Sequence, residues 1–404
     1  MPRVHSLSLR NPLTMRPSIE VSSSPLLTEF DYRPQTRVVF GSGTLSRLGD
    51  LSRELGANRV LLVTDSGLEK VGHAERGRKV LEEAGLKVAI FDKVHPNPTT
   101  LDVDACVAVA KQNEIDFIVG FGGGSSMDCA KGANFILTNG GQMSDYHGVG
   151  LATKPMLPMV AVPTTAGTGS EAQSFALISN PETHMKMACG DRKAACKAAI
   201  LDPDLTLTMP GSVASATGID AVTHAVESFV CTRRNPVSQL FARQAWQLLS
   251  RSLPVIFQGI ENTEARGATL LGAHLAGAAI ENSMLGAAHA LANPLTAHFG
   301  LTHGYAVGLM LPHVVRFNAE VCEAEYAMLA ADVGVEGASG LADYLDNLLS
   351  IMKLPRTLST TDVGFDESLI SVLAEEATQQ WTGQFNPRKI GEADLFAQLY
   401  RNAV

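Results

Sequence analysis

Short runs of β-branched residues alternate with stretches of helical periodicity between Arg37 and about Asp204. Strands that alternate with helices predict a parallel sheet covered by helices on both faces. We predict four strands here, over Arg59–Thr64, Lys87–Phe91, Phe117–Gly120 and Met159–Val162. The predicted helices between them are Ala74–Ala84, Val103–Gln112 and Ser126–Leu137. This part of the chain is therefore expected to be a Rossmann-like α/β domain.

Helical periodicity dominates the chain from Ser212 to its end, and no β-rich region follows. We predict nine helices there, over Ala214–Ser228, Ser238–Gln258, Glu264–Asn282, Ala288–His298, Ala306–Asn318, Glu323–Gly334, Gly340–Met352, Glu367–Thr378 and Glu392–Arg401. An α/β domain followed by an all-α domain leaves a cleft between the two, which is a common location for a ligand site.

The length of 404 residues exceeds what one ordinary hydrophobic core supports, so two domains are expected. We place the α/β domain at 29–205 and the helical domain at 206–404, after an extension over 1–28. The extension has three arginines and no acidic residue before Glu20, which fits either a transit peptide or a disordered start. It lacks the apolar segment of a secretion signal.

Charge and cysteine content exclude several classes of partner. The formal net charge is −9 and no long basic cluster occurs, so nucleic acid and anionic membranes are poor candidates. No run reaches the roughly 18 apolar residues of a membrane span. Six scattered cysteines without a C-x-x-C pair indicate reduced, buried thiols and not a disulfide framework or a zinc finger, as expected in a cytoplasmic protein.

One carboxylate and three histidines form a candidate metal site. Asp220 and His224 are four residues apart in a predicted helix, so their side chains lie on one face, where both can bind one cation. His289 and His303 follow downstream. Three imidazoles and one carboxylate suit Fe²⁺ or Zn²⁺, which acts as a Lewis acid toward an oxygen substrate. Each residue also has a simpler interpretation. Asp220 and His224 could form a local polar contact, His289 could be a core histidine, and His303 could be a loop residue.

Glycines and an acidic residue suggest a dinucleotide site. Gly122, Gly123 and Gly124 join a predicted strand to a helix, where backbone N–H groups can contact phosphate, although a tight turn alone would use the same residues. Asp65 follows another strand and could bind the ribose hydroxyls, which favours NAD over NADP; an ordinary turn aspartate is the alternative. The hydroxyl-rich segment Pro163–Glu171 suits a diphosphate or a nicotinamide ribose.

Together these segments resemble the iron-containing (group III) alcohol dehydrogenase family. The resemblance runs from Phe40 to Arg388 and rests on several motifs in order, namely Phe40–Gly43, Pro96–Thr99, Gly122–Asp128, Pro163–Glu171, Gly218–Glu227, His303-Gly304, Leu311–His313 and Asn386–Arg388. It implies an N-terminal NAD-binding domain, a helical metal-binding domain and an active site between them.

The resemblance also implies roles for individual residues. The metal ligands and catalytic residues would be Asp220, His224, His289 and His303. The NAD contacts would be Asp65, Asn97, Gly122, Gly123, Gly124, Ser125, Asp128, Thr164, Thr165, Thr168 and Lys186. The substrate pocket would include Phe175, Ile280, Leu285 and Asn293. Asn293 stands where many members have a second histidine, and asparagine cannot shuttle a proton near neutral pH.

We therefore expect an NAD-dependent, metal-dependent dehydrogenase that interconverts a small alcohol, such as 1,2-propanediol or a C2–C4 alcohol, with its aldehyde or ketone. The alternatives left open are a hydroxyacid–oxoacid transhydrogenase of the same family and a non-catalytic assembly protein. A homodimer or higher homo-oligomer is expected, because symmetric dimers are the commonest oligomers.

Overall fold

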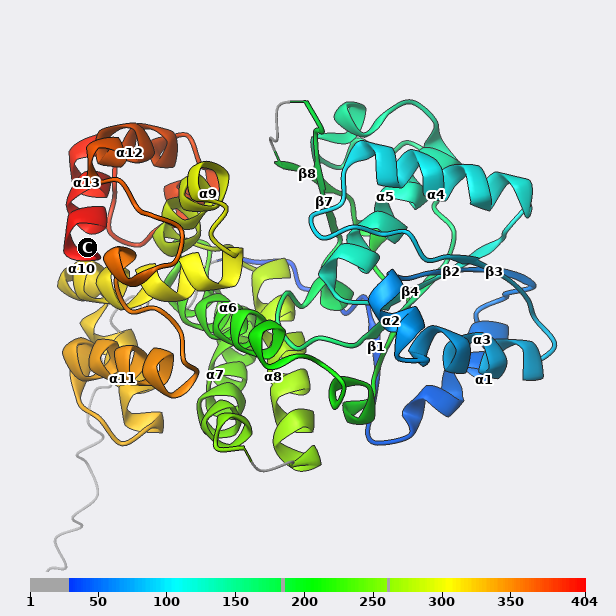
Figure 1. Cartoon of the computed structure of the whole chain (residues 1–404), viewed down its shortest axis with the longest axis horizontal. Coiled ribbons are helices and arrows are strands. Elements are labelled where there is room, and N and C mark those ends of the chain that lie inside the picture. The colour runs from blue at the N-terminus through cyan, green and yellow to red at the C-terminus, as the bar shows by residue number, and fades with distance from the viewer. Residues whose placement is uncertain (1–28, 183–185, 260–261) are drawn as a thin grey trace, which may run out of the picture.

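A computed structural model describes residues 29–182, 186–259 and 262–404 of the chain. The extension expected over 1–28 lies outside the described residues. An α/β part and a helical part lie side by side, as Figure 1 shows. This confirms the predicted fold class.

The α/β part is built on a six-stranded sheet with the order β1-β9-β6-β4-β2-β3, and every pair in it is parallel. Its strands are β1 (Arg37–Phe40), β2 (Arg59–Val63), β3 (Lys87–Phe91), β4 (Phe117–Gly122), β6 (Met159–Pro163) and β9 (Ala198–Leu201). The chain leaves β2 toward β3 on one side and later returns to β4 on the other. The strand order therefore reverses between β2 and β4, where ligands bind in open α/β sheets.

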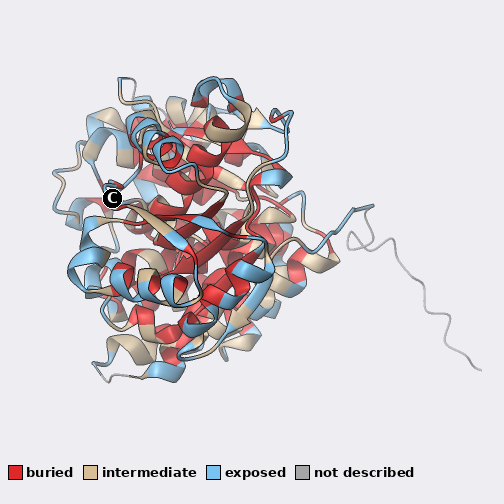
Figure 2. Cartoon of the chain, turned by 90° about the vertical axis from the view of Figure 1, so that its right-hand side faces the viewer, coloured by how far each residue is buried: buried red, intermediate tan, exposed pale blue. Residues whose placement is uncertain are grey.

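Helices cover both faces of this sheet. They are α1 (Leu48–Glu54), α2 (Ser66–Lys70), α3 (His73–Glu83), α4 (Thr100–Gln112) and α5 (Gly124–Asn139). Side chains of β2 alternate between the faces: Val60 and Leu62 pack in the core with α1 and α3, while Leu61 and Val63 pack with α4 and α5. Figure 2 shows the strands as a buried layer between helices whose outer faces are exposed.

A second, three-stranded sheet was not predicted. It has the order β5-β8-β7, with β7 (Phe175–Ser179) antiparallel to β8 (Lys186–Gly190) and β5 (Gly148–Val149) parallel to β8. The prediction missed it because β5 has two residues and β8 contains alanine, cysteine and glycine in place of β-branched residues. This sheet brings Lys186 and Phe175 beside the candidate site.

The helical part begins at α6 and matches the predicted periodicity. Its helices are α6 (Gly211–Val230), α7 (Pro236–Phe257), α8 (Thr263–Glu281), α9 (Ala287–Phe299), α10 (His303–Asp332), α11 (Gly337–Ile351), α12 (Ile370–Thr378) and α13 (Ala393–Asn402). The two helices predicted at 306–318 and 323–334 correspond to the two halves of α10, because the backbone leaves helical geometry at the kink at Cys322 (φ −131°) between them. Among the described helices, none has the length and apolarity needed to cross a membrane.

Candidate metal and cofactor site

Helix α6 carries the first two predicted metal ligands on its buried face. Asp220 and His224 are one helical turn apart, and His289 approaches from the first turn of α9. One potential ligand atom from each of these three residues lies within 4.8 Å of the others. The structure therefore brings together three residues that are up to 69 positions apart, all of them buried.

The distances within this cluster suit one shared cation. Asp220 Oδ1 lies 3.4 Å from His224 Nε2, 3.5 Å from His289 Nε2 and 3.9 Å from His303 Nε2. Metal–ligand bonds of about 2.0–2.2 Å in a tetrahedron separate the ligand atoms by roughly 3.3–3.6 Å. His303 is the outlying member, and its side chain is 31% exposed while the other three are buried.

Three side-chain atoms of the cluster residues are buried and have no hydrogen-bond partner among the described residues, namely Asp220 Oδ1, His289 Nε2 and His224 Nδ1. Two of them, Asp220 Oδ1 and His289 Nε2, lie next to each other. Buried polar atoms are normally paired, because an unpaired one costs about 1–3 kcal/mol. The unpaired oxygen and nitrogen face each other at 3.5 Å, as ligands of one ion do, so the residues fit a divalent cation.

Glu227 supports the cluster and was not predicted as a site residue. Its Oε2 accepts a 2.6 Å hydrogen bond from His289 Nδ1, and its Oε1 accepts one from the Ala288 backbone N–H. Because a carboxylate only accepts, His289 donates from Nδ1 and keeps its Nε2 lone pair for a cation. Its spacing of seven residues after Asp220 places Glu227 on the same face of α6, and this spacing was the available signal.

Charges in the cluster shift several pKa values. Burial would raise the pKa of Asp220, but the three neighbouring histidines hold it well below its ordinary range. Burial lowers the pKa of His224, and it lowers that of His303 to about 3. For His289 burial acts in the same direction, but Glu227 and Asp220 outweigh it and raise the pKa to about 9. Neutral imidazoles at His224 and His303 can offer lone pairs to a cation.

The predicted phosphate turn connects β4 to α5. Gly122 has φ +152°, a conformation that favours glycine, and the N-cap residue Gly123 provides no side-chain cap. A Cβ at Gly124 would lie 2.7 Å from Thr168 Cγ2, so the turn packs closely against the segment after β6. The first N–H groups of a 16-residue helix therefore have no side-chain cap and can receive an anion.

Lys131 fixes the segment that covers this turn. It is fully buried, and its Nζ donates to the backbone oxygens of Ser170, Gln173 and Phe175 at 2.6–2.9 Å. Ser170 also donates to Asp128 Oδ1 at 2.7 Å, while burial raises the pKa of Asp128. The predicted contacts Thr164, Thr165 and Thr168 lie just before this anchored segment, half-buried or buried. Lys131 was not predicted as a site residue.

Three further predicted NAD contacts, Lys186, Asn97 and Ser125, are connected by hydrogen bonds. Lys186 Nζ donates to Asn97 Oδ1 at 3.2 Å, and the Asn97 backbone N–H donates to Ser125 Oγ at 3.3 Å. Asn97 has φ +53°, which asparagine tolerates better than most residues. Desolvation lowers the pKa of Lys186, against the attraction of Asp128 and Asp220. Lys186 therefore hydrogen-bonds the proposed NAD contact Asn97 and also interacts electrostatically with Asp220 of the metal cluster.

Asp65 has a structural role as a helix cap; the sequence alone could not decide between a turn aspartate and a ribose contact. It is the N-cap of α2, and its Oδ1 accepts from the N–H groups of Gly67 and Leu68 at 2.9 and 3.1 Å. The residue is half-exposed and follows β2, next to the point where the strand order reverses. Its second carboxylate oxygen makes no hydrogen bond within the described part of the chain.

The predicted substrate residues come from both domains. The Phe175 ring of β7 stacks on Trp381 with centroids 6.3 Å apart, and Trp381 opens the 3-10 helix η9 (Trp381–Phe385) of the helical part. Ile280 lies in the last turn of α8 and is buried, while Leu285 is half-buried in the following loop. Asn293 donates to Gln380 Oε1 at 2.8 Å. His298 pairs with Glu376 on the surface, so it does not replace the missing histidine.

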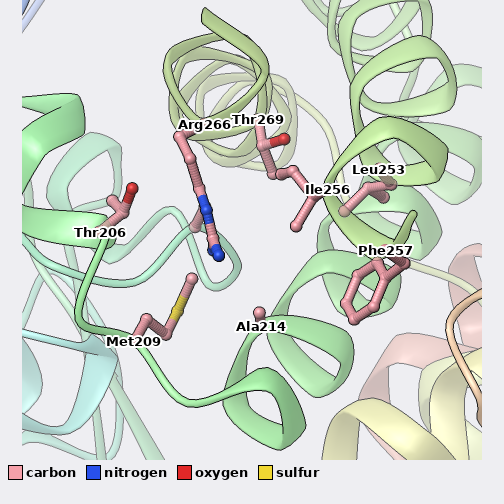
Figure 3. Close-up of a pocket in the computed structure, with 9 residues that line it drawn as sticks. Thr206, Met209, Ala214, Leu253, Ile256, Phe257, Arg266 and Thr269 are labelled. Carbon is pink, nitrogen blue, oxygen red and sulfur yellow. The ribbon is translucent and has the colours of Figure 1, made fainter. Parts of the chain in front are cut away.

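A small cavity elsewhere contains none of the predicted site residues. It lies between α6, α7 and α8, and the side chains of Arg266, Met209 and Phe257 line it among others, as Figure 3 shows. It offers neither the carboxylate–imidazole cluster nor the glycine turn. We therefore place the candidate site at the seam of the two domains.

The fold and the cluster together define a class of two-domain proteins. In this class a parallel α/β domain adjoins a helical domain whose carboxylate and histidines can hold a metal ion. The iron-containing alcohol dehydrogenase family matches residues 34–203, and its C-terminal domain matches residues 214–404. The chain belongs to the iron-containing alcohol dehydrogenase family and is an oxidoreductase of that family.

Individual relatives cover nearly the whole chain. The NAD-dependent methanol dehydrogenase of Bacillus methanolicus is 36% identical over 94% of this chain and 100% of its own length. The 1,3-propanediol dehydrogenase of Klebsiella pneumoniae is 35% identical over 93% of this chain and 98% of its own. A solved 1,3-propanediol oxidoreductase superposes with a TM-score of 0.90 at 35% identity, over 93% of this chain and 100% of that one.

Proposed function

We propose that the chain transfers hydride between a small alcohol and NAD, forming the aldehyde or ketone, with Fe²⁺ or Zn²⁺ held by Asp220, His224, His289 and His303. The observation that carries this proposal is the carboxylate oxygen surrounded by three imidazole nitrogens at 3.4–3.9 Å, close enough to Lys186 for electrostatic interaction. When bound, the cation supplies a Lewis acid beside the substrate oxygen.

The chain's own residues bind and orient the reactants. Glu227 holds the His289 ring so that its Nε2 faces the cation position. The turn at Gly122–Gly124 and the start of α5 receive the diphosphate, while Asp65, Asn97, Ser125, Asp128, Thr164, Thr165, Thr168 and Lys186 surround the rest of NAD. Hydride chemistry belongs to the cofactor, so alignment is the protein's contribution.

A small, uncharged substrate is favoured by two arguments. The predicted pocket residues Phe175, Ile280 and Leu285 are apolar, and apolar walls suit short neutral alcohols. The relatives named for methanol and 1,3-propanediol act on such molecules. The test is NADH formation with C1–C4 alcohols and its consumption with the corresponding aldehydes. The proposal expects turnover in the native protein and its loss in His289→Ala, whereas equal turnover in both proteins would contradict it.

We also propose a cytoplasmic homodimer. All six cysteines are free and buried, which suits a reducing compartment. Among the described strands β1 pairs only with β9, and its Val38 and Phe40 are 39% and 47% exposed, so this sheet edge can pair with a second copy. Val38→Lys should then yield monomers in light scattering, and an unchanged mass would exclude this edge as the interface.

A further inference from the structure

An amide pair joins α9 to the segment before η9 beside the metal cluster. Asn293 Nδ2 donates to Gln380 Oε1 at 2.8 Å. Asn293 lies four residues after His289 on α9, so the two side chains occupy the same face of the helix, about 5–6 Å apart at their Cβ atoms. The amide of Asn293 is therefore a neighbour of a proposed metal ligand.

The contacts of Gln380 determine how both amides are oriented. Gln380 Nε2 faces the backbone oxygen of Glu376 at 3.5 Å, and a carbonyl oxygen can only accept. Gln380 therefore turns its Oε1 toward Asn293, which must donate through Nδ2. No described residue donates to Asn293 Oδ1, and the half-buried side chain leaves this oxygen as a free acceptor.

The other residues predicted to line the substrate pocket are apolar. Trp381 directly follows Gln380 and stacks on Phe175 across the domain seam. The other predicted pocket residues, Ile280 and Leu285, are aliphatic. A single oriented polar atom in an apolar wall fixes which substrates bind, because a polar group of the substrate has one place to pair.

We propose that Asn293 is a specificity-determining residue whose Oδ1 accepts a hydrogen bond from a second hydroxyl of the substrate, which favours diols over monoalcohols. Gln380 is the positioning residue that keeps the amide in this orientation. The inference rests on the proposed dehydrogenase function and names its substrate class. A carboxylate cannot donate to Asn293 Oδ1 near neutral pH, so hydroxyacids gain nothing from this contact.

The test compares two substrates with equal numbers of heavy atoms, 1,3-propanediol and 1-butanol. We expect kcat/KM for the diol to exceed that for butanol by about 10-fold in the native protein, the scale of one hydrogen bond to a neutral group. Asn293→Leu should bring this ratio to about one or below. Because both substrates are measured in each protein, any general loss of activity cancels.

Two variants of Gln380 separate positioning from packing. Gln380→Glu keeps an acceptor toward Asn293 Nδ2 and should retain the preference for the diol, whereas Gln380→Leu frees the amide and should lower the ratio several-fold. These two variants carry the test if Asn293→Leu does not fold. A native protein without preference for the diol, or a ratio unchanged in Asn293→Leu or Gln380→Leu, overturns the inference. A native protein that oxidises neither alcohol contradicts the proposed function itself.

Discussion

Glu227 binds the His289 ring with one carboxylate oxygen and the first turn of α9 with the other. The carboxylate orients a metal ligand and stabilises the helix that carries it. Sequence reasoning found the proposed ligands on α6 from their i, i+4 spacing. It missed Glu227: the spacing of seven residues after Asp220 places Glu227 on the same face of α6, but its partners Ala288 and His289 lie on α9 and are known only from the fold.

Glu227→Gln should weaken metal binding about 10- to 100-fold, the usual effect of removing a carboxylate that supports a ligating histidine. The amide keeps the size of the side chain but loses its charge and offers a donor toward His289. Competition with a chelating dye measures the metal affinity. Glu375→Gln, an exposed change on α12, is the control. Equal affinities in the two variants would contradict the role of Glu227.

Asp65 combines a cap with a proposed contact to the ribose, so the choice of substitution matters. Serine can cap α2 as aspartate does, but it removes the charge that would repel a 2′-phosphate. Asp65→Ser should therefore raise the ratio of kcat/KM for NADP over NAD at least several-fold without loss of stability. Asp65→Ala should raise the same ratio but unfold more readily, by about 1 kcal/mol. An unchanged cofactor ratio in Asp65→Ser would exclude the ribose contact.

Helix α4 illustrates how an element near the cofactor segment is fixed at its start. The Asp102 carboxylate accepts from the Thr99 backbone and hydroxyl at 2.7 and 2.8 Å, and His95 Nδ1 lies 2.6 Å away. Burial would raise the pKa of Asp102, but the hydrogen bonds from His95 and Thr99 lower it. The carboxylate therefore stabilises the fold above its ordinary pKa of about 4, and this is lost as the pH falls through the lowered folded value.

Asp102→Asn should lower the free energy of unfolding by about 1 kcal/mol at pH 7, the usual effect of a lost cap. The difference from the native protein should shrink as the pH falls below 4, because the Asp102 carboxylate becomes protonated as the pH approaches its lowered folded pKa. Urea unfolding at pH 7 and pH 3 measures this. Asp104→Asn, an exposed change on the same helix, provides the control. A difference of the same size at both values would show that the charge of Asp102 contributes nothing.

The elements that the sequence predicts well are those with a strong local pattern. β3 begins and ends where predicted, and most helices are correct to within a few residues. β1, β9 and the small sheet were missed, because β1 and β9 have only four residues, β5 has two, and β8 lacks β-branched residues. The contact of Asn293 with Gln380 could not be predicted either, since it depends on how α9 packs against η9.

The two domains meet through a close backbone contact. A Cβ added to Gly277 of α8 would lie 2.5 Å from the backbone oxygen of Gly169, in the segment that Lys131 anchors. Ser174 reinforces the contact by donating from its backbone and hydroxyl to Glu281 at 2.9 and 2.6 Å. The seam thus sets the distance between the metal cluster and the cofactor segment.

Gly277→Ala should lower both stability and activity, because neither backbone can move away without opening the seam. We expect a loss of about 1–3 kcal/mol in the free energy of unfolding and a larger relative drop in kcat than in NAD affinity. Gly211→Ala on α6, where nothing lies within 4 Å of the added Cβ, is the matched control. If Gly277→Ala had the stability and kcat of the native protein, the close contact between Gly277 and Gly169 would not be needed to hold the two domains in place.

The central claim is that Asp220, His224, His289 and His303 hold one divalent cation on which turnover depends. The most direct measurement removes metal from the native protein with a chelator and titrates Fe²⁺ or Zn²⁺ back under anaerobic conditions, while NADH formation is followed. The account predicts that activity disappears on chelation and returns in proportion to bound metal, up to one ion per chain. Full activity at a metal content near zero would contradict it.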